Sequence, residues 1–429
     1  MSLPLPLCGF RWMPEEELSV FDVLTDFSMD SDTGFILEVD LEYDDRETML
    51  SHNSYPLAPE TLKVNEDLLS RYSRDVLLEL KGKTRHKATK LSSTFLPRQK
   101  YVLHAANLKL YLELGMKLTK IHRGITFHQE RFIEPYIQYC TAKRAAAKTK
   151  AESNVYKLLA NSLYGKMIES VGNRMDCRFN YNRSQMERRG MDPLYVGSVI
   201  CGENLAISFH KKRVLEMRQS WAVGFTILEL SKWIMYDLFY NTIRPALDDK
   251  VGVLMTDTDS YVLLSECESS DEVCERISDV MDFSTYAPSH PLYDPSRKNK
   301  VGYLKNEVPN DEIVKFVGVR SKTYCFSTRG GAFDKRAKGL KRNYQKALRL
   351  EDFEEVINSV ATKKMCQRTI MSRDHRLQIV HSYRTVFSSF DDKRYLLCPR
   401  HTTPYGSWMA DDCERTGVCY FCENPSVIV

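Results

Sequence analysis

The sequence predicts an α+β protein, because helical blocks and short apolar strands alternate without the strand–helix–strand rhythm of a doubly wound sheet. The chain has 429 residues, more than one domain usually holds, which favours two or three units that share interfaces. Hydrophobic residues make up 43% and charged residues 28%, both near the globular average, which disfavours disorder and coiled coil.

Local patterns predict the elements in order. Within an acidic N-terminal region, residues 34–41 have the apolar character of a strand, and residues 81–100 are polar and basic, as in a loop. From Tyr101 to Leu118, apolar residues recur at helical spacing. The other expected elements are helices at about 129–170, 221–247 and 345–364, a hairpin over 251–264 and a strand over 313–326.

The composition indicates an intracellular protein of the nucleus or cytoplasm. Twelve cysteines are too sparse for a disulfide scaffold and favour a reducing compartment. The N-terminus has two early prolines and no basic segment, unlike a signal peptide. The most apolar stretch, residues 223–238, contains Glu229, Lys232 and Asp237, so we expect a buried helix and no membrane partner.

Charge is distributed unevenly along the chain. Residues 1–61 contain fourteen acidic and two basic residues, so with a net charge of +4 the remainder carries +16. Between Phe316 and Leu350 there are ten Lys or Arg and one acidic residue, Asp334. Such an excess is typical of a protein that binds a polyanion, nucleic acid before membrane because no apolar anchor accompanies it. A solvated helix face is the alternative for any single run.

The segment 157–166 predicts a ligand-binding helix. Lys157, Asn161 and Tyr164 share one helical stripe, and we expect the helix to end at Gly165. Lys offers a point charge for a phosphate, Asn a two-way hydrogen bond, and Tyr a flat face for a base or sugar. An ordinary amphipathic helix with a glycine C-cap is the alternative. The opposite stripe, which we expect to be buried, contains Val155, Leu158, Leu159 and Leu163.

Two carboxylates, Asp257 and Asp259, lie at the expected tip of the apolar hairpin. Carboxylates this close repel each other unless a cation lies between them, and Mg²⁺ prefers such oxygen ligands while leaving positions for phosphates. The pattern therefore favours a magnesium site. The alternative is a solvent-exposed turn, in which Asp and Ser are common.

A third group, Arg320, Lys322 and Tyr324, would share one face of a single strand. Two cations and an aromatic ring in a row suit a sugar–phosphate backbone and a terminal base. A salt-bridged sheet surface is the alternative.

These motifs together resemble the family B DNA polymerases, and within them the protein-primed branch of adenoviruses, linear plasmids and Maverick/Polinton elements. Residues 157–165, Lys157-x-x-x-Asn-Ser-x-Tyr-Gly165, resemble motif B of the fingers. Asp257-Thr-Asp-Ser260 resembles motif C of the palm, and Lys322-x-Tyr324 the Lys-x-Tyr motif that grips the primer terminus. The resemblance extends from residue 1 to about 406. Further matching segments are 101–104, 107–115, 223–232, 338–341 and 390–394.

The resemblance implies a right-hand fold and nucleotidyl transfer from a deoxynucleoside triphosphate (dNTP) to a primer 3′-hydroxyl. Asp257 and Asp259 would be the catalytic metal ligands, with two Mg²⁺ ions in a complete site, and Lys157, Asn161 and Tyr164 would bind the nucleotide. The expected partners are primer–template DNA and dNTPs, and a terminal protein fits the protein-primed type. Residues that would contact DNA are Ser162, Gly165, Arg320, Lys322, Tyr324, Lys338 and Lys341.

The same resemblance implies a division into palm, fingers and thumb. The expected parts are a partial palm and connecting region at 1–120, fingers with motif B at 121–170, palm with motif C and Lys-x-Tyr at 171–330, thumb at 331–406, and a Cys-containing tail at 407–429.

Two departures from the family pattern affect the expected activity. The family's third catalytic carboxylate, in motif A, stands immediately before a segment that resembles residues 1–10, and the exonuclease domain also precedes it. We therefore expect an N-terminally incomplete palm, no exonuclease domain and no motif A Asp. Asp40 mimics motif A only superficially, since the subgroup carries a similar segment besides its motif A. Alternatives are a non-catalytic DNA-binding remnant of a mobile-element or viral polymerase, and a basic nucleic-acid-binding scaffold whose Asp-Thr-Asp is only a turn.

The C-terminal cysteines form a separate pattern. Cys413, Cys419 and Cys422, with Cys398 and His401 upstream, have the ligand types of a zinc site. A second Cys-x-x-Cys pair is missing from the pattern, so unpaired intracellular thiols are the expected state, with zinc as the alternative.

Overall fold

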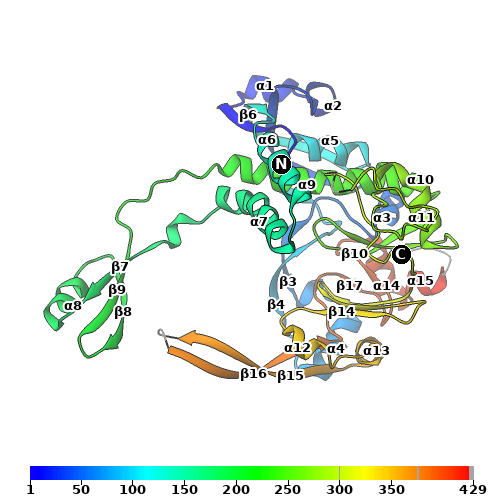
Figure 1. Ribbon diagram of the computed structural model, residues 1–429. Coiled ribbons are helices and arrows are strands. Elements are labelled where there is room, and N and C mark those ends of the chain that lie inside the picture. The colour runs from blue at the N-terminus through cyan, green and yellow to red at the C-terminus, as the bar shows by residue number, and fades with distance from the viewer. Residues whose placement is uncertain (299, 374–375, 425–429) are drawn as a thin grey trace.

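The computed structural model describes residues 1–298, 300–373 and 376–424. Helices and strands are mixed throughout these ranges, which confirms the α+β class. Figure 1 shows a body from which two arms extend on one side. No helix in the described ranges is long and apolar enough to cross a membrane.

One four-stranded antiparallel sheet organises the body, in the order β1–β6–β2–β5. Along β2 the alternate residues Leu37, Val39 and Leu41 are buried, as a strand with one face on the core requires. This confirms the strand expected over 34–41. The bounds are Leu5–Trp12 for β1, Thr33–Glu42 for β2, Arg98–His104 for β5 and Lys117–Glu130 for β6.

The helix expected from residue 101 to 118 is shorter, and α5 covers only Ala105–Glu113. It begins after His104, whose Nδ1 accepts a backbone N–H of the first turn at 3.2 Å. It ends before Gly115, which has a φ of 94°, a left-handed conformation that suits glycine. The apolar residues on either side of α5 belong to strands β5 and β6.

Helix α9 (Trp221–Asp237) lies at the centre of the largest hydrophobic core, between the sheet and a hairpin. It continues into η3 (Leu238–Ile243) and α10 (Arg244–Ala246), and the hairpin is formed by β10 (Val251–Thr256) and β11 (Tyr261–Ser265). The predictions of a helix over 221–247 and a hairpin over 251–264 are therefore confirmed. The short elements around this core are α1 (Glu15–Val20), α2 (Val23–Asp26), α3 (Arg46–Ser51), α11 (Ser270–Arg276) and η4 (Ser278–Val280).

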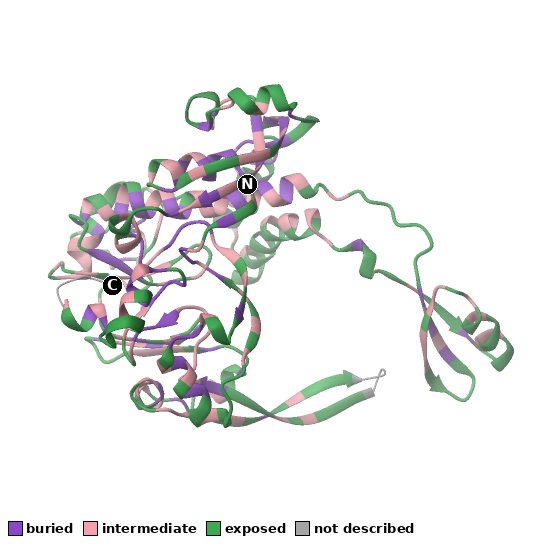
Figure 2. Cartoon of the chain, turned by 180° about the vertical axis from the view of Figure 1, so that it is seen from behind, coloured by how far each residue is buried: buried purple, intermediate pink, exposed green. Residues whose placement is uncertain are grey.

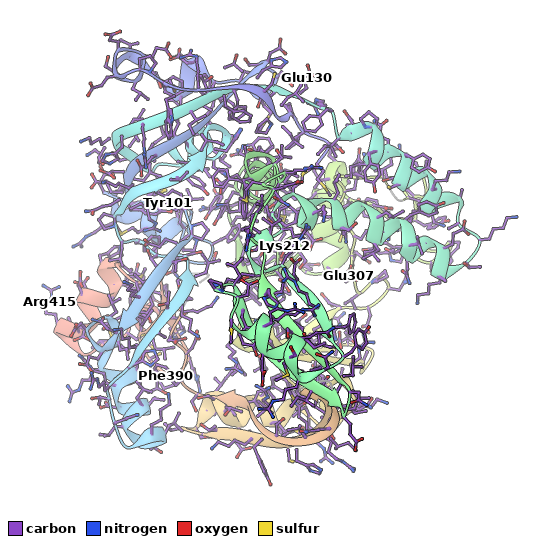
Figure 3. The ribbon with its side chains drawn as sticks, turned by 90° about the vertical axis from the view of Figure 1, so that its left-hand side faces the viewer. Tyr101, Glu130, Lys212, Glu307, Phe390 and Arg415 are labelled. Atoms are coloured by element: carbon purple, nitrogen blue, oxygen red, sulfur yellow. The ribbon has the colours of Figure 1, made fainter. Side chains whose placement is uncertain are left out.

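A second core joins the region between Leu50 and Leu96 to the C-terminal part of the chain (Figure 3, where Phe390 and Arg415 are labelled in this unit). Val64 and Leu77 pack in it with Tyr405, Met409 and Phe421, so residues 407–424 pack against the body. The region 81–100, expected as a loop, contributes β4, which pairs with β3. The elements are β3 (Glu60–Asn65), η1 (Glu66–Leu68), α4 (Arg71–Lys81), β4 (Lys87–Ser92), β17 (Tyr395–Leu396), β18 (Thr402–Thr403), α14 (Trp408–Thr416) and α15 (Tyr420–Glu423).

A third core lies under a three-stranded antiparallel sheet, β12–β13–β14. Val317 and Cys325 of this sheet pack with Phe353 and Phe387, so the expected border at 331 falls inside one packed unit. The helix expected over 345–364 is present only as α13 (Leu350–Asn358) and the short α12 (Arg342–Gln345). The strands are β12 (Ile313–Arg320), β13 (Thr323–Thr328), β14 (Phe333–Ala337), β15 (Thr362–Arg373) and β16 (Arg376–Ser388).

Two projections leave the body on the same side (Figure 1). One is the β15–β16 hairpin, and the other is a small sheet, β7–β9–β8, joined to the body by two extended segments. Figure 2 shows that both are mostly exposed, whereas the buried residues concentrate in the body. The remaining elements are α6 (Glu134–Ala146), α7 (Lys150–Met167), η2 (Val171–Asn173), β7 (Met175–Asn180), α8 (Arg183–Gly190), β8 (Tyr195–Gly202) and β9 (Leu205–Lys211).

Candidate functional site

The β10–β11 hairpin presents two carboxylates at its tip. The hairpin is anchored along its length, because Val251 and Val253 near its base are buried and the hydroxyl of Tyr261, next to the tip, donates to the Met235 carbonyl of α9. The tip is a tight turn in which the Asp259 N–H donates to the carbonyl oxygen of Asp257 at 2.8 Å. Asp257 is half-buried and Asp259 is exposed, so solvent reaches both carboxylates at the tip.

Lys322 meets this tip. Its Nζ lies 2.9 Å from Oδ1 of Asp257, so the structure brings together two motifs that the sequence places far apart. The side chains are 52% and 40% exposed, and an ion pair so open to water contributes at most about 1 kcal/mol to stability. The pair can therefore separate at little cost, which leaves the ammonium group free for an anion and the carboxylate for a cation.

The expectation that Arg320, Lys322 and Tyr324 share one strand face is wrong. The chain reverses between β12 and β13, Arg320 pairs with Thr323, and Lys322 lies in the turn with a φ of 59°. Tyr324 lies opposite Gly318 and its ring stacks on Phe316 with centroids 5.7 Å apart. Burial raises the pKa of Tyr324, so its hydroxyl stays protonated at neutral pH.

Lys338 and Lys341 lie in a loop that adjoins the Lys322 turn. The Lys338 N–H donates to the Lys322 carbonyl at 3.1 Å. The buried amide of Gln367 shapes this loop, since its Nε2 donates to the Gly339 carbonyl and its Oε1 accepts the Lys341 N–H, both at 3.1 Å. Sequence reasoning missed Gln367, because nothing distinguishes this residue from the other polar residues of a long exposed hairpin.

On helix α7, Lys157 and Asn161 are exposed and Tyr164 is half-buried. The Thr149 side chain caps the helix start by accepting the Glu152 N–H at 3.1 Å. The helix does not end at Gly165 but continues to Met167.

The expected burial of the opposite stripe of α7 is wrong for three of its four residues. Val155, Leu158 and Leu159 are 55%, 67% and 42% exposed. Leu163, the fourth residue of that stripe, packs on the main core together with Ala160 and Met167. Ser162 and Gly165 are exposed as well.

Helix α9 contacts the two elements that carry the predicted sites at different points along its length. The end of α7 packs at Gly224, where an added Cβ would come within 2.2 Å of the Ile168 side chain, so only glycine permits this approach. The Asp257 hairpin is anchored at Met235, roughly 16 Å further along the helix axis at 1.5 Å per residue. The structure thus brings Lys322 into contact with Asp257, whereas the end of α7 contacts α9 at a different point.

Asp40 does not join the hairpin carboxylates. It lies on β2, where its Oδ1 accepts the Lys100 N–H at 2.7 Å and lies 2.8 Å from Nε2 of His122. These partners hold the pKa of Asp40 below its usual value, the Lys100 hydrogen bond most strongly. Among the described residues, no third carboxylate, His or Cys forms a metal-sized group with Asp257 and Asp259.

Of the five residues with the ligand types of a zinc site, Cys413 lies apart from the others. Its thiol donates to the Leu397 carbonyl at 3.6 Å, and Cys419 and Cys422 lie with Cys398 and His401 instead. The sequence thus named all four residues of this group but also Cys413, which the structure places outside it.

Comparison with known proteins agrees with the fold expected from the motifs. Residues 60–172 match the family described as DNA polymerase type B, organellar and viral. The chain resembles the phi29 DNA polymerase complexed with primer–template DNA, with 16% identity and a TM-score of 0.51, and the ternary complex that also contains incoming nucleotide, with 15% and 0.52. Each match covers 90% of this chain and 55% of the polymerase, so the chain spans about half of its length. No curated protein matches the chain.

Proposed function

We propose that this chain, which has the right-hand fold of the family B DNA polymerases and their family match at residues 60–172, is the polymerase region of a protein-primed member. The reaction would transfer a nucleotidyl group from a dNTP to a primer 3′-hydroxyl and release pyrophosphate. The observation that carries the proposal is the approach of Lys322 to Asp257, because it unites a candidate metal ligand with a candidate primer ligand. The protein-primed type and a Maverick/Polinton-like origin rest on the sequence resemblance.

Asp257 and Asp259 fit a divalent metal. Both offer carboxylate oxygens, the ligands that Mg²⁺ prefers, and both are accessible at the hairpin tip. Asp259 is proposed as a ligand of both ions of a complete site and Asp257 as support. When bound, Mg²⁺ would activate the attacking oxygen and stabilise the leaving one. A complete two-metal site would need one more carboxylate than the hairpin supplies.

The turn at Lys322 is proposed to hold the primer end. Released from Asp257, the Lys322 ammonium group can pair with a backbone phosphate, and the half-buried ring of Tyr324 offers a face to the terminal sugar or base. Lys338 and Lys341 lie in the adjoining loop, and Arg320 at the end of β12, as further phosphate ligands. Gln367 would position this loop without contacting DNA.

Helix α7 is proposed as the nucleotide and template face of the fingers. Lys157 would neutralise the triphosphate, and Asn161 and Tyr164 would line the nascent base pair. At Gly165 an added Cβ would meet nothing within 4 Å, so the protein's own packing does not require this glycine. A glycine inside a helix costs about 0.5–1 kcal/mol relative to Ala, and close approach of DNA, together with Ser162, would be the reason for it.

Replacement of Lys157 by Ala is expected to weaken binding of a Mg²⁺–dNTP to the protein–primer–template complex by about tenfold or more, because a charge-assisted bond to phosphate is lost. Lys166→Ala is the matched control, since Lys166 is on the same helix but pairs with Glu169 at 2.6 Å. Calorimetric titration measures both affinities, and circular dichroism checks the fold. Equal effects of the two variants would place the triphosphate elsewhere.

We propose the expected division into palm, fingers and thumb, with one change to the start of the thumb. The main sheet, α9 and the β10–β11 hairpin would form the palm, α6 and α7 the fingers, and residues from about 331 to 406 the thumb. Because β12–β14 share a core with α13 and β16, the thumb would begin nearer residue 313.

Binding of the isolated chain to DNA is expected to be electrostatic, given the +16 balance after residue 61. Log affinity should fall linearly with log salt concentration, since phosphate contacts release counterions. The double variant Lys338→Ala/Lys341→Ala should lower the slope by about two. Lys117→Ala, an exposed lysine 3.2 Å from Asp44, should leave the slope unchanged. Fluorescence anisotropy measures the slopes, and salt-independent binding would contradict the proposal.

The second candidate function is a non-catalytic DNA-binding remnant. It is favoured by one observation, that no third carboxylate joins Asp257 and Asp259 among the described residues. The two candidates share the expected DNA binding and differ only in synthesis.

A further inference from the structure

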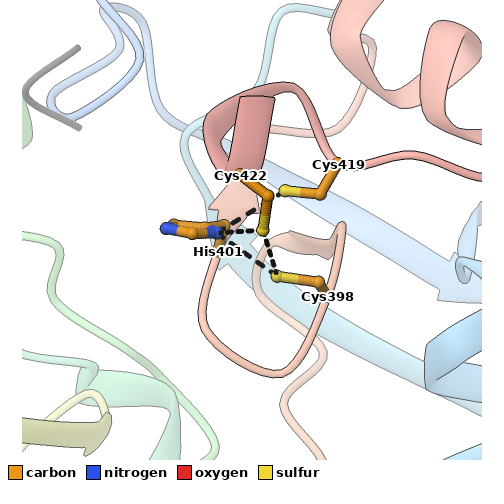
Figure 4. Close-up of side chains that lie close together, drawn as sticks. All are labelled: Cys398, His401, Cys419 and Cys422. Atoms are coloured by element: carbon orange, nitrogen blue, oxygen red, sulfur yellow. Dashed lines mark hydrogen bonds between the residues drawn. The ribbon is translucent and has the colours of Figure 1, made fainter. Parts of the chain in front are cut away.

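Four potential metal ligands converge near the C-terminal end of the described chain (Figure 4). Cys398 and His401 lie in the turn that joins β17 to β18, and Cys419 and Cys422 lie at the start and within α15. One ligand atom from each lies within 4.8 Å of all the others, and none of the three cysteines is in a disulfide. We propose that Cys398, His401, Cys419 and Cys422 bind one Zn²⁺ ion.

The distances between the ligand atoms match the edges of a zinc tetrahedron. Nδ1 of His401 lies 3.3 Å from Sγ of Cys398 and 3.5 Å from the Sγ atoms of Cys419 and Cys422. The Sγ atoms of Cys398 and Cys422 are 3.9 Å apart. With zinc–sulfur bonds of about 2.3 Å and zinc–nitrogen bonds of about 2.0 Å, a tetrahedron has edges of about 3.5 Å for S–N and about 3.8 Å for S–S.

Hydrogen bonding among the thiols does not explain this geometry. Three thiols surround one imidazole nitrogen, which accepts or donates only a single hydrogen bond, whichever tautomer or protonation state the ring adopts. A disulfide would join only two of the cysteines and leave the third thiol and the imidazole unused. A cation at the shared centre satisfies all four groups. The small separation leaves room for one ion, not for a multi-iron cluster.

Backbone hydrogen bonds hold each of the two pairs of ligands in a closed turn. The Leu397 N–H donates to the His401 carbonyl at 3.0 Å, which closes the Cys-x-x-His turn. The Cys422 N–H donates to the Cys419 carbonyl at 3.0 Å, which closes the Cys-x-x-Cys turn. These two turns hold each pair of ligands at a fixed spacing, so binding orders few side chains.

The ion would be structural. All four positions are filled by protein groups, so no position stays open for a substrate. The ligands border the second core, in which Cys419 and Phe421 are buried with Leu397 and Val64. Zinc would therefore tie the β17–β18 hairpin to α15, and both to the β3–α4 region. This role is independent of the proposed polymerase activity.

Metal analysis of the full chain, purified under reducing conditions, tests the site. We expect one zinc per chain by mass spectrometry, and cobalt exchange should give the visible d–d bands of a tetrahedral thiolate site. Cys422→Ser, at the exposed ligand, should lose the zinc. Cys413→Ser is the matched control and should retain it, because that thiol faces the Leu397 carbonyl. Removal of zinc by a chelator should lower the thermal unfolding midpoint of the unmodified chain but not of Cys422→Ser.

A fourth variant separates loss of ligation from misfolding. His401→Cys keeps four ligands suited to zinc and should retain the ion. Zinc binding by this variant would show that a substitution within the site leaves the two turns folded. The proposal is overturned if the unmodified chain, folded by circular dichroism, contains no stoichiometric zinc after growth and refolding with zinc. It is also overturned if Cys422→Ser keeps the ion as tightly as Cys413→Ser does.

Discussion

A polypeptide of residues 1–429 alone is expected to extend a primer at least about 10²–10³-fold more slowly than a form that also carries an upstream motif A Asp. The hairpin supplies Asp257 and Asp259, and the described residues place no third carboxylate beside them. Without that group, the ion that activates the 3′-hydroxyl loses both positioning and charge stabilisation. Primer extension with Mg²⁺ and all four dNTPs measures the ratio.

DNA binding serves as the control for this comparison, since both forms should bind primer–template DNA with the same salt dependence. Robust extension by residues 1–429 alone would show that a carboxylate within the chain completes the site. Equal and negligible extension by both forms would instead favour the DNA-binding remnant.

Replacement of Glu229 by Ala is expected to destabilise the fold by about 3–5 kcal/mol, the usual cost of removing one partner of a buried charged network. Glu229 is 3% exposed at the centre of the main core. Its carboxylate accepts Nδ2 of Asn107 at 2.9 Å and the His104 N–H at 3.3 Å, and it pairs with Lys232. The substitution would remove one of the two hydrogen bonds of the Asn107 amide and leave the His104 N–H and the partly buried Lys232 ammonium group unpaired at the junction of α5 and α9.

Glu187→Ala is the control for this stability measurement. Glu187 pairs with Arg183 at 2.7 Å, but both side chains are exposed, so the loss should stay below about 1 kcal/mol. Chemical denaturation of the two variants compares their free energies of unfolding. Equal losses would mean that the Glu229 network does not hold α9 on the body.

The sequence predicted the elements whose patterns are strictly local. The hairpin at 251–264 has apolar strands on both sides of a polar turn, and the strand at 34–41 alternates, so both were expected correctly. The reversal at Ser321 and Lys322 was missed, because neither residue is a Gly, Pro or Asn and the apolar alternation continues through the turn. Only the pairing of β12 with β13 reveals it.

Burial and convergence depend on neighbours that the sequence does not identify. The apolar stripe of α7 was expected to be buried, yet Leu158 is exposed and only Leu163 of that stripe packs on the main core. In the same way, the sequence grouped Cys413 with four other candidate ligands, whereas the fold brings together only Cys398, His401, Cys419 and Cys422. The meeting of Lys322 with Asp257 became visible only in the structure.

The most direct test of a catalytic hairpin is primer extension by Asp259→Asn in the form that carries motif A. Asp40→Asn is the matched control, because Asp40 is the carboxylate that superficially mimics motif A but pairs with His122 on β2. We expect Asp259→Asn to abolish synthesis and Asp40→Asn to retain it, with both variants folded by circular dichroism. Retained synthesis in Asp259→Asn, or its loss in Asp40→Asn alone, would contradict a reaction centre at the β10–β11 hairpin.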